Sequence, residues 1–278
     1  MPLIKDVYQE LLSSIENTSV EKSSFDILFQ NFLNFENQVE VELHAFDEMP
    51  DYKLLKKQLN RLLIGEPVQY IINKGYFYGN EFYVDNRVLI PRMETEELID
   101  LCLHHTKGLE SPVVYDICTG SGCLGITFKM KNENALVYLS DISKDALSVA
   151  KKNAEKYHVQ NISFRKSDLF SAIDESEKFN VVAANLPYVT FAEYEKLDRQ
   201  VRDWEPELAL TADDDGLLLI NRLCDNLERL LTPDGFAVLE MSPHQTAKVK
   251  ERLEKLNFNA KTVDDYTGRA RFVCAKKK

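Results

Sequence analysis

The sequence lacks the patterns that mark several large classes of protein. Its 278 residues contain no CxxC pair, no HExxH spacing, no apolar run as long as a membrane span and no apolar N-terminal stretch typical of a signal peptide. The five cysteines are odd in number, which favours free thiols in a reducing cytoplasm over a disulfide framework. We therefore expect a soluble cytoplasmic protein without a metal site.

Positive charge is also scarce. The chain has 34 Lys and Arg against 45 Asp and Glu, a formal net charge of −11 and a pI of about 5.1. Nonspecific binding to DNA or RNA depends on Lys and Arg that neutralise phosphates. The charge balance therefore counts against nucleic acid as the main partner, and no membrane partner is expected.

Glycine is almost absent from the first quarter of the chain, where Gly65 is the only one. Two apolar stripes with helical spacing occupy this segment: Leu55, Leu59, Leu62 and Leu63, and Phe25, Leu28, Phe29 and Phe32. We predict a small helical domain over residues 1–73. Residues 74–92 alternate aromatic or β-branched with polar residues, and Gly79-Asn80 is a turn signal, so a connecting β-hairpin is predicted there.

From residue 93 to 278 the pattern alternates between strands and helices, which predicts a parallel sheet with helices on both faces. The connection between the last two strands is too short for a crossover helix, so these strands should pair antiparallel. The predicted helices are 94–107, 122–131, 143–157, 216–231 and 244–256. The predicted strands are 113–117, 136–140, 162–165, 179–184, 235–241, 260–264 and 270–275.

A strand followed by a turn of small residues begins the chemically informative part of the sequence. Val113–Ile117 runs into Cys118-Thr119-Gly120-Ser121-Gly122, and a helix is predicted to follow. Such a turn lets backbone approach a ligand closely, and a helix N-terminus offers free N–H groups. A dinucleotide site would have GxGxxG, but Cys118 occupies the position of its first glycine, so a nicotinamide cofactor is not favoured.

Two carboxylates follow the next predicted strands. Asp141 lies about 20 residues beyond the glycine turn, where a carboxylate can accept hydrogen bonds from both ribose hydroxyls. A helix cap is the alternative, and the spacing from Gly120 favours the ribose. Asp168 can accept from the exocyclic amine of adenine, with Leu169 and Phe170 as apolar cover; a helix cap or turn is again the alternative. The Asp168 motif is not specific by itself.

Asn185-Leu186-Pro187-Tyr188, at the end of the fourth predicted strand, is the most specific motif. The Asn185 side chain can accept one N–H of a planar NH2 group, and the Leu186 carbonyl can accept the other. Pro187 fixes the backbone beside that carbonyl, and Tyr188 can stack on a flat substrate. The motif predicts a site for a planar amide or amine.

Together these motifs resemble the amino-methyltransferases and, among them, the protein (glutamine-N5) methyltransferases of the HemK/PrmC family. Further segments carry the resemblance across nearly the whole chain: Gly65–Ile71, Leu89–Glu96, Val201–Pro206, Ala209-Leu210 and Asp215-Gly216. The Arg92–Glu96 stretch separates this family from DNA adenine methyltransferases better than Asn185–Tyr188 does. The sequence departs from the family at Leu186 and Met93, where proline is common, and at Cys118, where glycine is common.

The resemblance implies a seven-stranded Rossmann-like α/β fold, S-adenosyl-L-methionine as cofactor and S-adenosyl-L-homocysteine as product. It implies N5-methylation of the glutamine in the Gly-Gly-Gln loop of class-1 peptide chain release factors, with the helical domain and hairpin helping to recognise that partner, and we expect a monomer. The expected cofactor-binding residues are Asp116, Cys118, Thr119, Gly120, Ser121, Gly122, Asp141, Ile142, Asp168, Leu169 and Asn185. The expected catalytic and substrate-binding residues are Asn185, Leu186, Pro187 and Tyr188, joined for substrate binding by Arg92, Glu94 and Thr95.

Two alternatives remain at this point. Adenine N6 in DNA or RNA presents the same planar NH2, and Asn-Leu-Pro-Tyr is also typical of the rRNA adenine dimethyltransferases. The net acidic charge and the Arg92–Glu96 stretch favour a protein substrate. A catalytically silent cofactor-binding subunit is the other alternative, and the intact Asn185–Tyr188 motif argues against it.

Overall fold

The computed structural model describes all residues from Met1 to Lys278 and divides them into two compact units. Unit 1 contains Met1–Lys74 together with Asp198–Trp204, and unit 2 contains Gly75–Leu197 and Glu205–Lys278. The residues predicted as a connecting hairpin, 74–92, lie in unit 2 from Gly75 onward. None of the helices combines the length and apolar character that crossing a bilayer would require.

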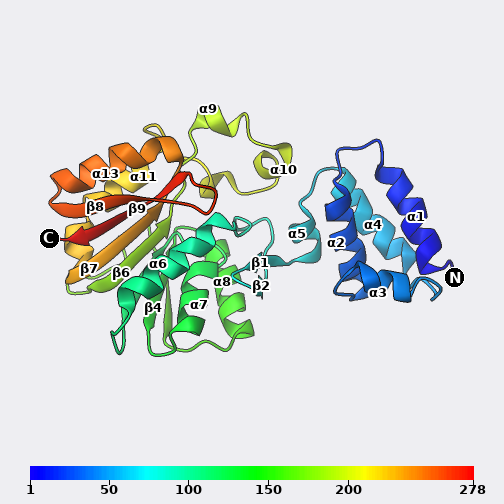
Figure 1. The fold of residues 1–278 in the computed structure, drawn as a ribbon, viewed down its shortest axis with the longest axis horizontal. Coiled ribbons are helices and arrows are strands. Elements are labelled where there is room, and N and C mark those ends of the chain that lie inside the picture. Colours follow the sequence, from blue (N-terminus) through cyan, green and yellow to red (C-terminus); the bar gives the residue numbers. More distant parts are fainter. The chain divides into compact units, whose positions relative to one another are not determined.

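Unit 1 is helical (Figure 1). Leu55, Leu59 and Leu62 of one predicted stripe and Phe25, Leu28 and Phe29 of the other are buried in a single core. The side chain of Asp51 accepts a hydrogen bond from the backbone N–H of Leu54 and so caps the fourth helix. The helices are α1 (Ile4–Ile15), α2 (Lys22–Leu33), α3 (Gln38–Leu43), α4 (Tyr52–Leu63), α5 (Val68–Ile72) and the short α10 (Arg199–Arg202).

Unit 2 is built on a seven-stranded sheet in the order β5-β4-β3-β6-β7-β9-β8. The first five of these strands run parallel to one another, and β9 is antiparallel to both β7 and β8. The antiparallel pairing of the last two strands, β8 and β9, was predicted. Chain order reverses between β3 and β6, which is where ligands bind in open sheets of this kind. The strands are β3 (Val113–Ile117), β4 (Leu136–Asp141), β5 (Ile162–Lys166), β6 (Phe179–Asn185), β7 (Leu231–Glu240), β8 (Phe258–Asp264) and β9 (Ala270–Lys277).

Helices cover both faces of the sheet (Figure 1). Successive strand residues point to opposite faces, so Val114 packs with α6 (Glu97–Thr106), α7 (Cys123–Lys131) and α8 (Lys144–Lys156). Its neighbour Tyr115 belongs to the core on the other face. That face is covered by α11 (Leu218–Cys224), α12 (Leu227–Leu230) and α13 (Thr246–Lys255). Shorter elements are α9 (Phe191–Tyr194) and the 3-10 helices η1 (Glu94–Glu96), η2 (Glu207–Ala209) and η3 (Pro243–Gln245).

The predicted hairpin is present as β1 (Gly75–Phe77) and β2 (Asn80–Phe82), but the predicted turn was one residue out of register. The turn residues are Tyr78 and Gly79, both with positive φ (51° and 74°), and Asn80 already belongs to β2. Positive φ at both central positions of a two-residue loop is the geometry of a type I′ turn. The side chain of Asn80 donates to the Tyr78 carbonyl, which explains the asparagine after the glycine.

The helix predicted over 216–231 was also too long. It is divided into α11 and α12, and it ends at Leu230 because Leu231 already pairs with Phe179 at the start of β7. The strand predicted over 235–241 accordingly begins at Leu231 and ends at Glu240, with an irregular register near Gly235.

Candidate active site

The carboxyl ends of β3, β4 and β6 surround a cavity of about 260 Å³ in unit 2. This volume lies slightly below the range of roughly 300–1,000 Å³ that is typical of small-molecule sites. A smaller cavity of about 50 Å³ shares Leu89, Cys118, Gly120 and Asn185 with it. The larger cavity contains seven of the predicted cofactor residues: Cys118, Gly120, Asp141, Ile142, Asp168, Leu169 and Asn185. The smaller one adds Asp116, Thr119 and Ser121.

The glycine turn lies across the floor of these cavities. The backbone N–H of Gly120 donates to Asp141 at 3.0 Å, which fixes the turn against the end of β4. A Cβ on Gly120 would meet no atom within 4 Å, so this face of the loop is open to a ligand. Gly122 is needed for helix packing. A Cβ there would lie 2.8 Å from Ile126 and 3.0 Å from Ala150, so its glycine allows α7 and α8 to pack closely.

Asp116 is buried beneath the turn, at the penultimate position of β3. One of its oxygens, Oδ2, accepts from the Thr119 hydroxyl at 2.5 Å and from the Gly125 N–H at 3.0 Å. Burial raises the pKa of Asp116 to about 7, against the effect of these two hydrogen bonds. Asp116 and Thr119 therefore hold the turn in shape and also form a wall of the smaller cavity.

Asp141 is the last residue of β4, and each of its carboxylate oxygens accepts a hydrogen bond from the backbone. Oδ1 accepts from the Ser143 N–H at 2.9 Å and Oδ2 from the Gly120 N–H at 3.0 Å. Burial raises the pKa of Asp141, whereas these backbone donors lower it. Each carboxylate oxygen can accept a further hydrogen bond. The helix cap predicted as the alternative role belongs instead to Ser143, whose side chain accepts from Ala146 at the start of α8.

The carboxylate of Asp168 has a partner that the sequence did not reveal. Asp168 is exposed and pairs with Arg222 of α11 at 3.0 Å, and both residues line the cavity. Leu169 is buried with φ +52° and lines the same cavity, as does the half-exposed Ile142. Phe170 does not line the cavity; it packs against the core near α12, where Arg229 lies over its ring.

Asn185 is the last residue of β6 and borders both cavities. Its side-chain Nδ2 donates to the hydroxyl of Thr95 at 3.0 Å, and that hydroxyl donates to Glu240 at 2.8 Å. Thr95 and Glu240 are buried. The side-chain amide of Asn185 is therefore held at the mouth of the smaller cavity by a buried hydrogen-bonded chain.

The rest of the motif surrounds this amide. Leu186 is buried, and its carbonyl accepts none of the turn, loop or side-chain hydrogen bonds. Pro187 lines the larger cavity. Tyr188 lines neither cavity; its hydroxyl donates to Glu240 at 3.4 Å and its carbonyl accepts from Gln245 at 2.9 Å. Substrate stacking by Tyr188 therefore stays a prediction.

The residues predicted on the 92–96 stretch divide into different roles. Arg92 lines the smaller cavity and forms an ion pair of 2.6 Å with Glu205, which also accepts from the Ile90 N–H. Thr95 lines that cavity too. Glu94 borders neither of the two cavities, and its part in substrate binding stays a prediction.

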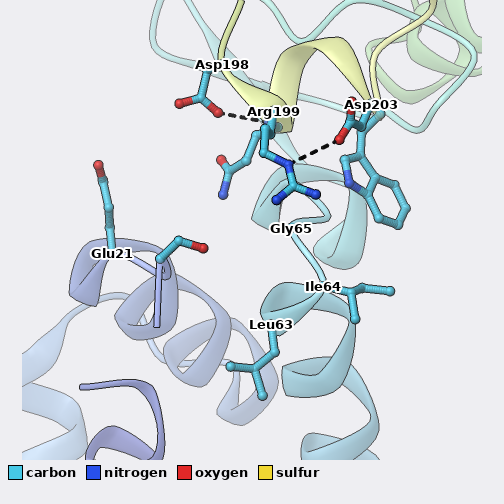
Figure 2. A pocket seen from close by; sticks show the side chains of 10 residues that line it. Glu21, Leu63, Ile64, Gly65, Asp198, Arg199 and Asp203 are labelled. Atoms are coloured by element: carbon cyan, nitrogen blue, oxygen red, sulfur yellow. Dashed lines mark hydrogen bonds and ion pairs between the residues drawn. The ribbon is translucent and has the colours of Figure 1, made fainter. Parts of the chain in front are cut away.

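A separate cavity of about 430 Å³ lies in unit 1 (Figure 2). Leu63 at the end of α4 and the following Ile64 and Gly65 border it, together with Asp198 and Arg199, and Figure 2 labels these residues. Arg199 is paired with Asp203 at 3.5 Å there. None of the predicted site residues lines this cavity, so its greater volume does not make it the candidate site.

Comparison with known proteins fits the geometry of unit 2. A family model described as a methyltransferase domain matches residues 110–273. The release factor glutamine methyltransferase of Koribacter versatilis is 34% identical over 281 residues, 99% of this chain and 98% of that one. The protein of the same name from Leptospira interrogans is 36% identical over 250 residues, covering 87% and 83%. The chain belongs to the release factor glutamine methyltransferase family.

The methyltransferase fold is also found in solved structures. A methyltransferase from Pyrococcus furiosus superimposes with a TM-score of 0.53 at 16% identity, covering 80% of this chain and 98% of that one. At this identity the likeness extends to the fold alone. It agrees with the predicted seven-stranded Rossmann-like architecture.

Sequence reasoning missed several residues of this methyltransferase site. Glu240, Glu205 and Arg222 contact predicted site residues but come from segments 52 to 145 residues away in the chain. The one available signal was a lone acid at the end of an apolar strand, in Val238–Met241. An acid in that position rarely stays buried without a specific partner.

Proposed function

We propose that this protein transfers a methyl group from S-adenosyl-L-methionine to the side-chain nitrogen of the glutamine in the Gly-Gly-Gln loop of class-1 release factors, leaving S-adenosyl-L-homocysteine. The observation that carries the proposal is the position of Asn185, which lines both the cavity of about 260 Å³ and the smaller one. Family membership supplies the substrate class, because the relatives are named for release factor glutamine methylation.

The donor set of the larger cavity fits an adenosyl group. Asp141 keeps one acceptor position on each carboxylate oxygen, which suits a pair of ribose hydroxyls. Asp168 offers an acceptor for an amine on the base, and the apolar side chains of Leu169 and Ile142 can cover the ring faces. The open face of Gly120 lets the ligand approach the backbone. When bound, S-adenosylmethionine supplies an electrophilic methyl group on a sulfonium.

Asn185 and Leu186 would bind the glutamine amide. A primary amide is a poor nucleophile because its nitrogen lone pair is delocalised into the carbonyl. The Asn185 oxygen and the Leu186 carbonyl, which has no loop or side-chain partner, would each accept one amide N–H. These hydrogen bonds strengthen as the nitrogen becomes positive, so they stabilise the transition state more than the bound substrate.

Positioning supplies much of the remaining rate enhancement. Holding two reacting groups at about 3 Å in the correct orientation is worth roughly 7–11 kcal/mol. The rigid end of β6, the buried Leu186 and the fixed φ of Pro187 provide that orientation. We further propose that unit 1 helps to recognise the release factor, which brings the loop to this site.

The test is transfer of labelled methyl groups to three acceptors. These are a purified class-1 release factor, the same factor with alanine in place of the Gly-Gly-Gln glutamine, and duplex DNA. We expect label on the first acceptor only, and mass spectrometry should locate one added methyl group on that glutamine. Label on DNA and none on the release factor would overturn the proposal in favour of adenine N6 methylation.

A further inference from the structure

Glu240 is a buried acid beside the candidate site, and the mechanism proposed above gives it no role. It ends β7, pairs in register with Asn185 of β6, and is 2% exposed. It contacts neither cavity. Its two oxygens accept hydrogen bonds from Thr95 at 2.8 Å and from Tyr188 at 3.4 Å. A buried carboxyl group is costly to keep unless it serves a partner.

The hydrogen-bond directions in this chain are determined by the carboxylate. An ionised carboxylate can only accept, so the Thr95 hydroxyl must donate its single hydrogen to Glu240. The Thr95 oxygen is then an acceptor toward Asn185, and the Asn185 atom at 3.0 Å from it must be the NH2 nitrogen. The Asn185 oxygen is therefore the amide atom turned away from Thr95.

We propose that Glu240 is a positioning residue that acts through Thr95 to hold the Asn185 amide with its oxygen toward the acceptor nitrogen. The proposal rests on the methyl transfer proposed above and deepens it. An amide at position 240 can donate to Thr95 instead of accepting. The Thr95 hydroxyl would then donate to Asn185, whose side chain would present NH2 to the substrate. The NH2 group of Asn185 and that of the glutamine repel each other, so Asn185 could no longer bind the glutamine amide.

The hydrogen-bonded chain from Glu240 through Thr95 to Asn185, called the relay below, is sensitive to pH because of the surroundings of Glu240. The pKa of Glu240 is raised to about 7, chiefly by burial and in part by Glu94 of η1, whereas the hydrogen bond from Thr95 and the charge of Arg271 of β9 act to lower it. Tyr188 is the remaining titratable neighbour, and burial raises its pKa far above neutrality. Arg271 is itself paired with Asp265 at 3.3 Å. Above pH 7 the carboxylate accepts and the relay has the productive direction; below pH 7 a protonated Glu240 can donate and reverse it.

The experiment compares Glu240→Gln, Thr95→Val and Thr95→Ser with the unmodified enzyme, using the full chain, S-adenosylmethionine and release factor. Glu240→Gln and Thr95→Val should each lower kcat about 100-fold, the loss seen when one preorganised hydrogen bond is removed from an active site. Thr95→Ser keeps the hydroxyl and should restore most of the rate. Calorimetry with S-adenosylhomocysteine should give nearly unchanged affinity for all three. Thr106→Val, a buried threonine on α6 remote from the cavities, is the matched control and should keep full activity.

The pH profile separates positioning from simple packing. The unmodified enzyme should lose kcat as the pH falls through about 7, following the pKa of Glu240. The profile is recorded at saturating S-adenosylmethionine, because Asp116 on the cofactor side also has a pKa raised by burial to about 7. In Glu240→Gln the acid limb of kcat should then be absent, because residue 240 no longer titrates. The relay is overturned if Glu240→Gln keeps the normal kcat, or if its acid limb is unchanged. An unmodified enzyme that methylates no release factor would instead refute the proposed function, so the two failures are distinct.

Discussion

The two sides of the candidate site are constructed differently. On the cofactor side, the site is built mainly from backbone groups. The Gly120 and Ser143 N–H groups hold Asp141, and open backbone faces the cavity. On the acceptor side, a side-chain relay from Glu240 through Thr95 orients Asn185. Backbone geometry tolerates substitution as long as the turn forms, whereas a directed relay fails when one member changes. Substitutions should therefore affect binding on one side and catalysis on the other.

Asn185→Ala gives the largest expected effect. The variant loses one of the two oxygens that would accept the glutamine amide, and we expect kcat to fall by about 1000-fold or more. The affinity for S-adenosylhomocysteine, measured by calorimetry, should change little. Asn180→Ala, at the opposite end of β6 where the side chain accepts from Val113, is the control and should retain transfer. Wild-type turnover in Asn185→Ala would show that the Asn185 oxygen is not needed to bind the glutamine amide.

Asp141→Asn tests the cofactor side. The carboxylate accepts one backbone N–H on each oxygen, and an asparagine would place NH2 against one of those donors. We expect the dissociation constant for S-adenosylmethionine to rise by about 10–100-fold, or roughly 1.4–2.8 kcal/mol. Turnover at saturating cofactor should be close to normal. A large fall in kcat without weaker binding would contradict the division between the two sides.

The two glycines of the turn sharpen the comparison within the cofactor side. Both have positive φ, so alanine at either position costs about 1–2 kcal/mol of backbone strain. The Cβ of Gly120→Ala would point into open space and should weaken cofactor binding. The Cβ of Gly122→Ala would meet Ile126 and Ala150, which adds about 1–3 kcal/mol of lost stability. Thermal unfolding and calorimetry on both variants check this, and equal losses of stability would refute it.

The architecture of unit 2 was predictable because strand and helix patterns are local. The strand predicted over 113–117 and the end of β6 at Asn185 both have the expected context, an apolar strand followed by polar residues. The errors have non-local or geometric causes. Leu231 joined β7 because it pairs with Phe179, and no local pattern reveals that pairing. The hairpin turn moved to Tyr78-Gly79 because the two-residue loop fixes which positions take positive φ.

The same distinction applies to the candidate site. Asp141 and Asn185 follow strand ends that meet at the switch point, so their place in one cavity could be predicted. Glu240 could not be connected with Thr95, because their contact spans 145 residues and depends on the register of β7 beside β6. The pairing of Arg92 with Glu205, across 113 residues, has the same origin.

Cys118→Gly gives the smallest expected effect and tests one departure from the family pattern. Cys118 has φ +59°, a conformation that costs a residue with a Cβ about 1–2 kcal/mol and costs glycine little. The greater freedom of an unfolded glycine offsets part of the gain. We expect the free energy of unfolding to rise by less than about 1 kcal/mol, and the melting temperature by up to about 2–4 °C, with methyl transfer preserved.

Cys118→Ala is the matched control, because it removes the sulfur and keeps the Cβ in the strained conformation. Burial raises the pKa of the Cys118 thiol well above its usual value, so the sulfur stays protonated and acts as a small packing group. Alanine should therefore show none of the gain. If both variants are stabilised equally, the benefit comes from losing the thiol, and left-handed strain is not the reason that glycine is common at this position.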